Sequence, residues 1–181
     1  MRKALYILGK LEDGDVNWLG TNGVSQHLKA GTVIVRQGEP VDWLFIVIDG
    51  QLLVFSGTFE IAKLAAGEVV GEISFVDSRP PSASVRAAVD SQVLAINKEL
   101  LSGKLLKDPG FSSRFYLALA IFLADRLRVT TSRLTAARKG QDAGPQEDLD
   151  ELDPEMLENI ALASARFDMM VKRLASKSPK G

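Results

Sequence analysis

Short apolar segments separated by glycines fill the middle of the chain and restrict its fold more than any other feature. These segments recur about every 8–12 residues, a spacing typical of β-sandwiches and β-barrels. Many of their residues are β-branched or aromatic, and Asp49-Gly50 favours a tight hairpin turn. We predict strands at residues 32–35, 42–48, 51–55, 59–64, 83–88 and 92–96, with turns near the glycines at 31, 38, 50, 67 and 71. A mainly β fold is therefore expected, with segment 42–48 covered on both faces.

The composition argues against several functional classes. The 181 residues include no cysteine and one histidine, His27, so the chain can form no disulfide and cannot supply the imidazole cluster of a metal enzyme. We expect His27 to be an ordinary surface residue before the first strand. A net charge of −1 argues against a chain-wide nucleic-acid surface. No apolar run reaches the ~18 residues of a membrane span, and residues 1–10 lack a signal-peptide pattern. A cytoplasmic protein with one main core is expected.

The stretch from Gly71 to Val85 has the chemistry of an anion-binding loop. It reads Gly-Glu-Ile-Ser-Phe-Val-Asp-Ser-Arg-Pro-Pro-Ser-Ala-Ser-Val. A short helix after Gly71 would direct backbone N–H groups outward, and small residues let an anion come close. We therefore predict a ligand site here.

This stretch resembles the phosphate-binding cassette of cyclic-nucleotide-binding domains, the sensor modules of catabolite-activator (Crp/Fnr-like) regulators and cyclic-nucleotide-dependent kinases. The resemblance covers roughly residues 16–138, and the glycines fall where that family's β-roll turns. It implies a jelly-roll-like β-roll with flanking helices, followed by a long dimer helix, to which the sequence pattern described below adds one extra helix. It also implies that Glu72 holds a ribose hydroxyl and that Ser82 lies beside the cyclic phosphate, with the N–H groups of Ile73 and Ala83 as donors. Thr130 and Thr131 would approach the base, through an Arg-Leu-x-Val-Thr segment at 126–130.

One position departs from the family pattern. The family places an arginine on the cyclic phosphate, and this chain has Pro81 there, which offers neither charge nor a backbone N–H. Losing such a partner costs about 2–5 kcal/mol, or roughly two to three decades of affinity. Arg79, two residues upstream, is the nearest alternative cation. The prediction is weak or absent binding of cyclic AMP and cyclic GMP, or a pocket suited to another small anion.

Two helices are expected after the last strand. Asn97 can cap residues 98–106, and a longer helix extends from Phe111 to about Arg138. One side of the longer helix carries Phe115, Leu119 and Phe122. The other carries a stripe with the spacing of a short coiled coil, namely Tyr116, Ala120, Leu123, Leu127, Thr130 and Leu134. This stripe predicts a homodimer, although a helix buried within a monomer would also be apolar on two sides.

The end of the chain predicts an accessory element. Residues 139–153 form an acidic linker, 154–176 an amphipathic helix and 177–181 a disordered tail, after a first domain at 1–138. Arg166 is placed on the polar face of that helix, whose apolar face must dock on its own domain or on a partner subunit. No basic helix-turn-helix can be formed here, and the arginines at 126, 128, 133 and 138 are interpreted as a solvated face, so we expect no direct DNA binding.

These residues allow three functions to be considered. The first is a regulatory sensor domain with a degenerate or altered pocket. The second is a structural module that uses the β-roll as a scaffold and the last helix to recruit an unknown protein partner. The third, an enzyme, is disfavoured because no nucleophile with a general base is recognisable. We expect the first, with no resident metal or cofactor.

Overall fold

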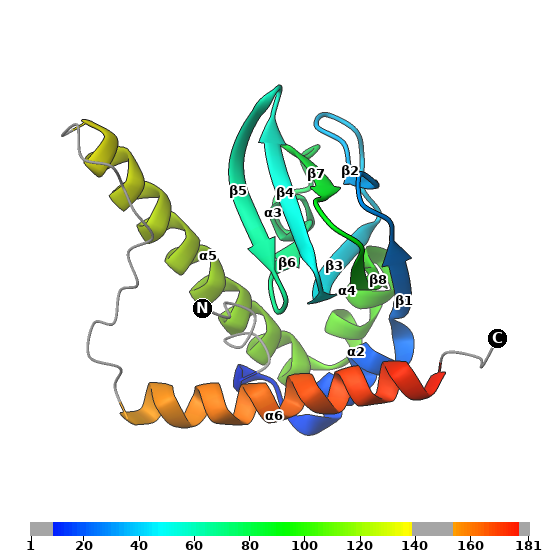
Figure 1. Cartoon of the computed structure of the whole chain (residues 1–181). Helices are drawn as coiled ribbons and strands as arrows, with labels where there is room; N and C mark the ends of the chain where they lie inside the picture. Colours follow the sequence, from blue (N-terminus) through cyan, green and yellow to red (C-terminus); the bar gives the residue numbers. More distant parts are fainter. Residues whose placement is uncertain (1–8, 139–153, 178–181) are drawn as a thin grey trace.

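Two four-stranded antiparallel sheets form the body of the molecule (Figure 1). The structure is a computed structural model that describes residues 9–138 and 154–177. Strand order is β1-β8-β3-β6 in one sheet and β2-β7-β4-β5 in the other. The strands are β1 (Val24–Leu28), β2 (Val33–Val35), β3 (Trp43–Asp49), β4 (Gln51–Ser56), β5 (Phe59–Ala65), β6 (Val69–Val70), β7 (Ser84–Ala87) and β8 (Ser91–Asn97). The predicted β-roll is confirmed.

Strand β3 separates two apolar clusters. Phe45 and Val47 lie with residues of β4 and β7 in the cluster between the sheets. Leu44, Ile46 and Ile48 point the other way, into a cluster shared with the helices. All five side chains are buried, as expected of a strand covered on both faces.

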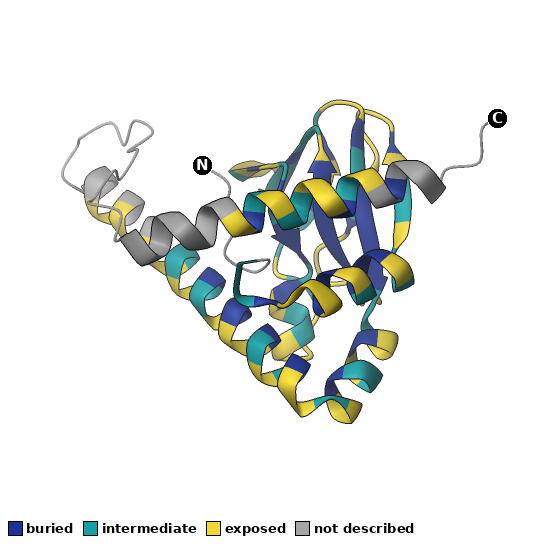
Figure 2. Cartoon of the chain, turned by 90° about the horizontal axis from the view of Figure 1, so that it is seen from below, coloured by how far each residue is buried: buried dark blue, intermediate teal, exposed yellow. Residues whose placement is uncertain are grey.

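The longer helices share an apolar cluster with outward-facing residues of β3 and β8. The helices are α2 (Asp13–Asn22), α3 (Glu72–Val76), α4 (Lys98–Lys107), α5 (Pro109–Arg138) and α6 (Pro154–Lys177). The side chain of Asn97 accepts a hydrogen bond of 3.0 Å from the N–H of Leu100, which confirms the predicted cap of α4. Phe115, Leu119 and Phe122 of α5 are buried, and the opposite side of this helix is exposed (Figure 2).

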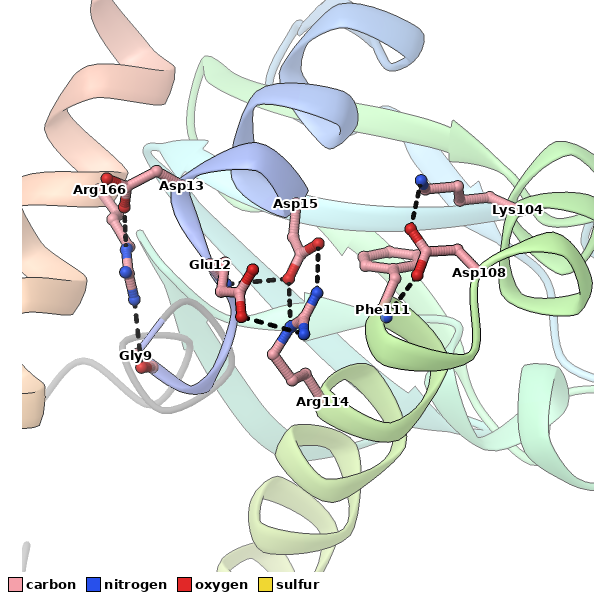
Figure 3. A network of polar contacts seen from close by, with 9 residues as sticks. All are labelled: Gly9, Glu12, Asp13, Asp15, Lys104, Asp108, Phe111, Arg114 and Arg166. Carbon is pink, nitrogen blue, oxygen red and sulfur yellow. Dashed lines mark hydrogen bonds and ion pairs between the residues drawn. The ribbon is translucent and has the colours of Figure 1, made fainter.

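Helix α6 packs on α2 of the same chain. Ala163, Met170 and Leu174 are buried at this contact, where Met170 Cγ lies 3.6 Å from the position that a Cβ on Gly20 would take. The placement of Arg166 on the solvated face was wrong. Its Nε donates to Asp13 Oδ1 at 2.7 Å and its Nη1 to the Gly9 carbonyl at 3.2 Å (Figure 3). Helix α6 is therefore held against its own chain both by apolar packing and by the hydrogen bonds of Arg166.

Several elements were not predicted from the sequence. Strands β1 and β6 and helix α2 were missed, and His27 lies within β1 rather than before the first strand, although it is exposed. The linker at 139–153 and the tail from 178 lie outside the described residues, as do the side chains of Met156 and Ile160 on α6. Within the described part of the chain, no helix combines the length and apolarity needed to cross a membrane.

Candidate ligand-binding site

Gly71 sets the geometry of the candidate site. Its φ of +90° lies in the left-handed region, and a Cβ at this position would come within 2.7 Å of the Trp43 carbonyl oxygen. A side chain here would therefore be strained and would clash with backbone. The chain turns at Gly71, and α3 begins at the next residue, Glu72.

Glu72 is buried and paired with a cation from a distant element. It is 2% exposed, and its Oε1 accepts from Nη1 of Arg126 on α5. The guanidinium of Arg126 also lies over the Phe122 ring, 5.2 Å from its centroid. The expectation that Arg126 belongs to a solvated face was therefore wrong. The signal that could have found it was the Arg-Leu-x-Val-Thr segment that begins at this residue.

Burial and nearby cations act in opposite directions on the pKa of Glu72. Burial raises the pKa of the Glu72 carboxyl, and the positive charges of Arg126 and Lys98 offset this only in part. The backbone N–H groups of Glu72 and Ile73 also act on the carboxylate and lower its pKa. The N–H of Ile73, predicted as a donor to a ligand, thus already faces the side chain of Glu72.

The raised pKa leads to a prediction for Glu72→Gln. Glutamine mimics the neutral acid and does not ionise, so this variant should keep the stability that the wild type loses on ionisation. Because the folded pKa is raised, the contribution of Glu72 is fully present below the unfolded pKa and is lost as pH rises through the folded pKa. The stability of Glu72→Gln relative to wild type, measured by urea unfolding, should therefore increase from pH 4 towards neutral pH. Parallel pH profiles would contradict this.

Residues 81–83 form the other side of the cassette. Pro81 is half-buried, and its carbonyl accepts a hydrogen bond of 2.9 Å from the N–H of Gly38. Ser82 is exposed and Ala83 is half-buried. The side chain of Pro81 gives this loop no charge with which to hold a phosphate.

Arg79 does not take the place of the missing arginine. Its side chain is 83% exposed, and its Nε lies 3.8 Å from Asp77 Oδ2. It lines a cavity of about 340 Å³ between α3 and α4, whose lining does not include Glu72. Another cavity, of about 520 Å³, lies between α2 and α4 and is lined by residues such as Trp18 and Lys107.

The two threonines predicted to approach a base are exposed on α5. The Thr130 hydroxyl donates to the Arg126 carbonyl at 2.8 Å, and the Thr131 carbonyl accepts from the Thr135 hydroxyl at 2.9 Å. Among the described residues, neither threonine side chain is hydrogen-bonded to the cassette. Helix α5 therefore reaches the cassette through Arg126, one turn before Thr130.

The predicted dimer stripe is exposed over most of its described length. Tyr116 is 48% exposed and Leu127 is 67% exposed. Ala120 and Thr130 are also exposed and Leu123 is half-buried, while the side chain of Leu134 lies outside the described residues. The structure thus leaves an apolar row on α5 that the described residues do not cover.

Comparison with known proteins assigns this domain to a family. The profile of the cyclic nucleotide-binding domain matches residues 25–108, and this part of the chain belongs to that family. An uncharacterized NTE family protein of Mycobacterium tuberculosis is 27% identical over 128 residues, which are 70% of this chain and 22% of that protein. The chain thus spans about a fifth of the length of that relative.

Solved structures show the same fold. A cyclic nucleotide-binding domain from Methylobacillus flagellatus aligns with a TM-score of 0.66 and 22% identity, covering 75% of this chain and 82% of that one. The N-terminal domain of a transcriptional regulator from Streptomyces coelicolor aligns with a TM-score of 0.58 and 24% identity, covering 73% and 94%. At this identity the likeness concerns the fold, which is that of the family's β-roll.

Proposed function

We propose that this chain is a non-enzymatic regulatory sensor domain, cytoplasmic, whose pocket binds cyclic AMP and cyclic GMP weakly or not at all. The fold and the Gly71–Glu72 turn are those of the family, and Glu72 keeps the position of the carboxylate that accepts from a ribose hydroxyl. What is missing is a cation for the cyclic phosphate, because Pro81 stands in that position and the exposed Arg79 lines a different cavity.

The contact between Glu72 and Arg126 is the observation that carries this proposal. Glu72 has 2% of its surface exposed and already has a cationic partner. A ribose hydroxyl would have to share or displace Arg126 to reach the carboxylate, and this costs part of a charged hydrogen bond. Without a guanidinium at position 81, the cyclic phosphate forms no charged hydrogen bond there that would offset this cost.

Calorimetric titration tests the proposal. We expect cyclic AMP and cyclic GMP to bind far more weakly than micromolar, and adenosine to bind about as well as cyclic AMP because the phosphate has no cation. Sub-micromolar cyclic AMP binding would overturn the proposal. If none of the three compounds bound, the result would support the second candidate function, a ligand-free scaffold. The contact of Arg126 with Glu72 also favours that candidate.

We further propose that the chain acts as a homodimer through the apolar row on α5. Tyr116, Leu123 and the exposed Leu127 follow one another along α5 with the spacing of a coiled-coil seam. A second copy of the chain would remove this apolar surface from water. The same row continues past the contact with Glu72, so the dimer and the pocket share one helix.

Leu127→Glu should convert the dimer to a monomer. A carboxylate in a seam would be desolvated next to its symmetry mate, which is strongly unfavourable. Light scattering should then give half the mass of the wild type. Leu106→Glu is the matched control, because Leu106 is 85% exposed on α4, outside the row. An unchanged dimeric mass for Leu127→Glu would place the interface elsewhere.

A further inference from the structure

A second cavity lies behind the cassette and carries cationic and hydroxyl groups. Its volume is about 340 Å³, and it lies between α3, the start of α4 and the loop at 78–80. Six of the residues that line it matter here: Val41, Ser74, Phe75, Arg79, Lys98 and Ser102. Glu72, Pro81 and Ser82 are not among the lining residues, although Ser74, Phe75 and Arg79 belong to the same 71–85 stretch.

Lys98 is a half-buried cation without a close counter-ion. Its Nζ donates to Ser74 Oγ at 2.8 Å, and Ser74 Oγ in turn donates to the Gly71 carbonyl at 3.2 Å. No carboxylate of the described residues is within 4.0 Å of this ammonium group. Burial lowers the pKa of Lys98, and the attraction of Asp42, Glu72 and Asp77 does not restore it. An anion in the cavity would supply the missing charge.

The rim of the cavity adds a movable second cation. Arg79 is highly exposed and only loosely paired, at 3.8 Å from Asp77, so its guanidinium can turn towards the cavity. Ser78, at the same rim, has a φ of +58°, the one positive φ among the described non-glycine residues. The lining residues include two cations, Lys98 and Arg79, and one carboxylate, the exposed Glu99. The carboxylates of Asp42 and Asp77 act on Lys98 from outside the lining.

The lining of the cavity also includes apolar side chains, which form its apolar wall. They are those of Pro40, Val41, Phe75 and Pro80. Phe75 also packs edge-on against Phe115 of α5, with ring centroids 6.1 Å apart. A ligand that contacts Phe75 would therefore touch a side chain that packs on the long helix.

We propose that this cavity binds a small phosphate monoester, with the phosphate on Lys98 and Arg79 and an apolar or ring group on Phe75 and Val41. Two cations and the hydroxyls of Ser74 and Ser102 provide more donors than a single carboxylate could use, whereas a phosphate offers three terminal oxygens. The apolar wall distinguishes such an ester from free phosphate. This site does not depend on the function proposed for the pocket at Glu72.

Phenyl phosphate is the probe, and the full chain is titrated with it by calorimetry and by amide NMR. We expect it to bind more tightly than inorganic phosphate, and phenol not to bind measurably. The amide signals of Ser74 and Ser102 should shift, and those of Thr130 and Thr131 should not. Absent binding, or shifts confined to the cassette residues 81–83, would overturn the proposal.

Four variants locate the site. Lys98→Gln should weaken phenyl phosphate binding by roughly tenfold or more, since it removes a charged donor, and Lys98→Arg should keep most of the affinity. Lys107→Gln is the matched control, because Lys107 is an exposed lysine of the same helix that lines the other cavity. Glu72→Gln removes a negative charge that acts on Lys98, so this variant should not weaken phenyl phosphate binding. Equal effects of Lys98→Gln and Lys107→Gln on the affinity would refute the assignment, and so would a loss of affinity in Glu72→Gln. Thermal unfolding of each variant identifies any that misfolds.

Discussion

Replacing Pro81 with arginine should raise the affinity for cyclic AMP by about 100- to 1,000-fold over the wild type. A guanidinium at this position can donate two parallel N–H bonds to the cyclic phosphate, which proline cannot. The backbone should tolerate the change, because the hydrogen bond that position 81 makes to Gly38 uses its carbonyl, which any residue supplies. Calorimetry at one fixed salt concentration measures the gain.

Pro80→Arg is the matched control for this experiment. Pro80 is the preceding residue and is exposed, so the variant has the same net charge with the guanidinium one position away. We expect its affinity for cyclic AMP to stay within a few-fold of wild type. Equal gains in affinity in the two variants would mean that the added positive charge, and not the position of the guanidinium, causes the gain. No gain in Pro81→Arg would mean that Arg126 closes the site regardless of position 81.

The elements predicted correctly are those whose signals are local. Asn97 can be recognised as a cap because the donors it satisfies lie within three residues. Gly71 can be recognised as a turn because only glycine fits its backbone angle without strain. The buried side of α5 follows from the 3.6-residue period, which is also local.

The elements that were missed depend on partners far away in the sequence. Strand β6 has two residues and exists because Val69 and Val70 pair with β3. Strand β1 contains three polar residues in a row and gains its strand character by pairing with β8. Arg126 and Glu72 are 54 residues apart, and no periodicity in either segment indicates their contact. A family resemblance could locate Glu72, but the cation that occupies it is a property of the folded chain.

Asp15→Ala should lower the free energy of unfolding by about 2–4 kcal/mol. Asp15 is 5% exposed and accepts three hydrogen bonds: two from Arg114 on α5, at 2.7 and 3.0 Å, and one from the Glu12 N–H at 2.9 Å (Figure 3). The substitution would leave a guanidinium without its main partner and would remove half of the capping box of α2. Urea unfolding followed by circular dichroism measures the change.

Asp90→Ala is the matched control, because Asp90 makes the same kinds of contact at the surface. It accepts from Lys29 Nζ at 2.8 Å and from the Ala30 N–H at 2.9 Å, and both side chains of the pair are exposed. Water and salt screen such a pair, so this variant should change stability far less than Asp15→Ala. The difference in the free energy of unfolding between the two variants would then show how much burial strengthens the contact between α2 and α5. If Asp90→Ala proved equally destabilising, the Asp15–Arg114 contact would not be what anchors the long helix to the rest of the fold.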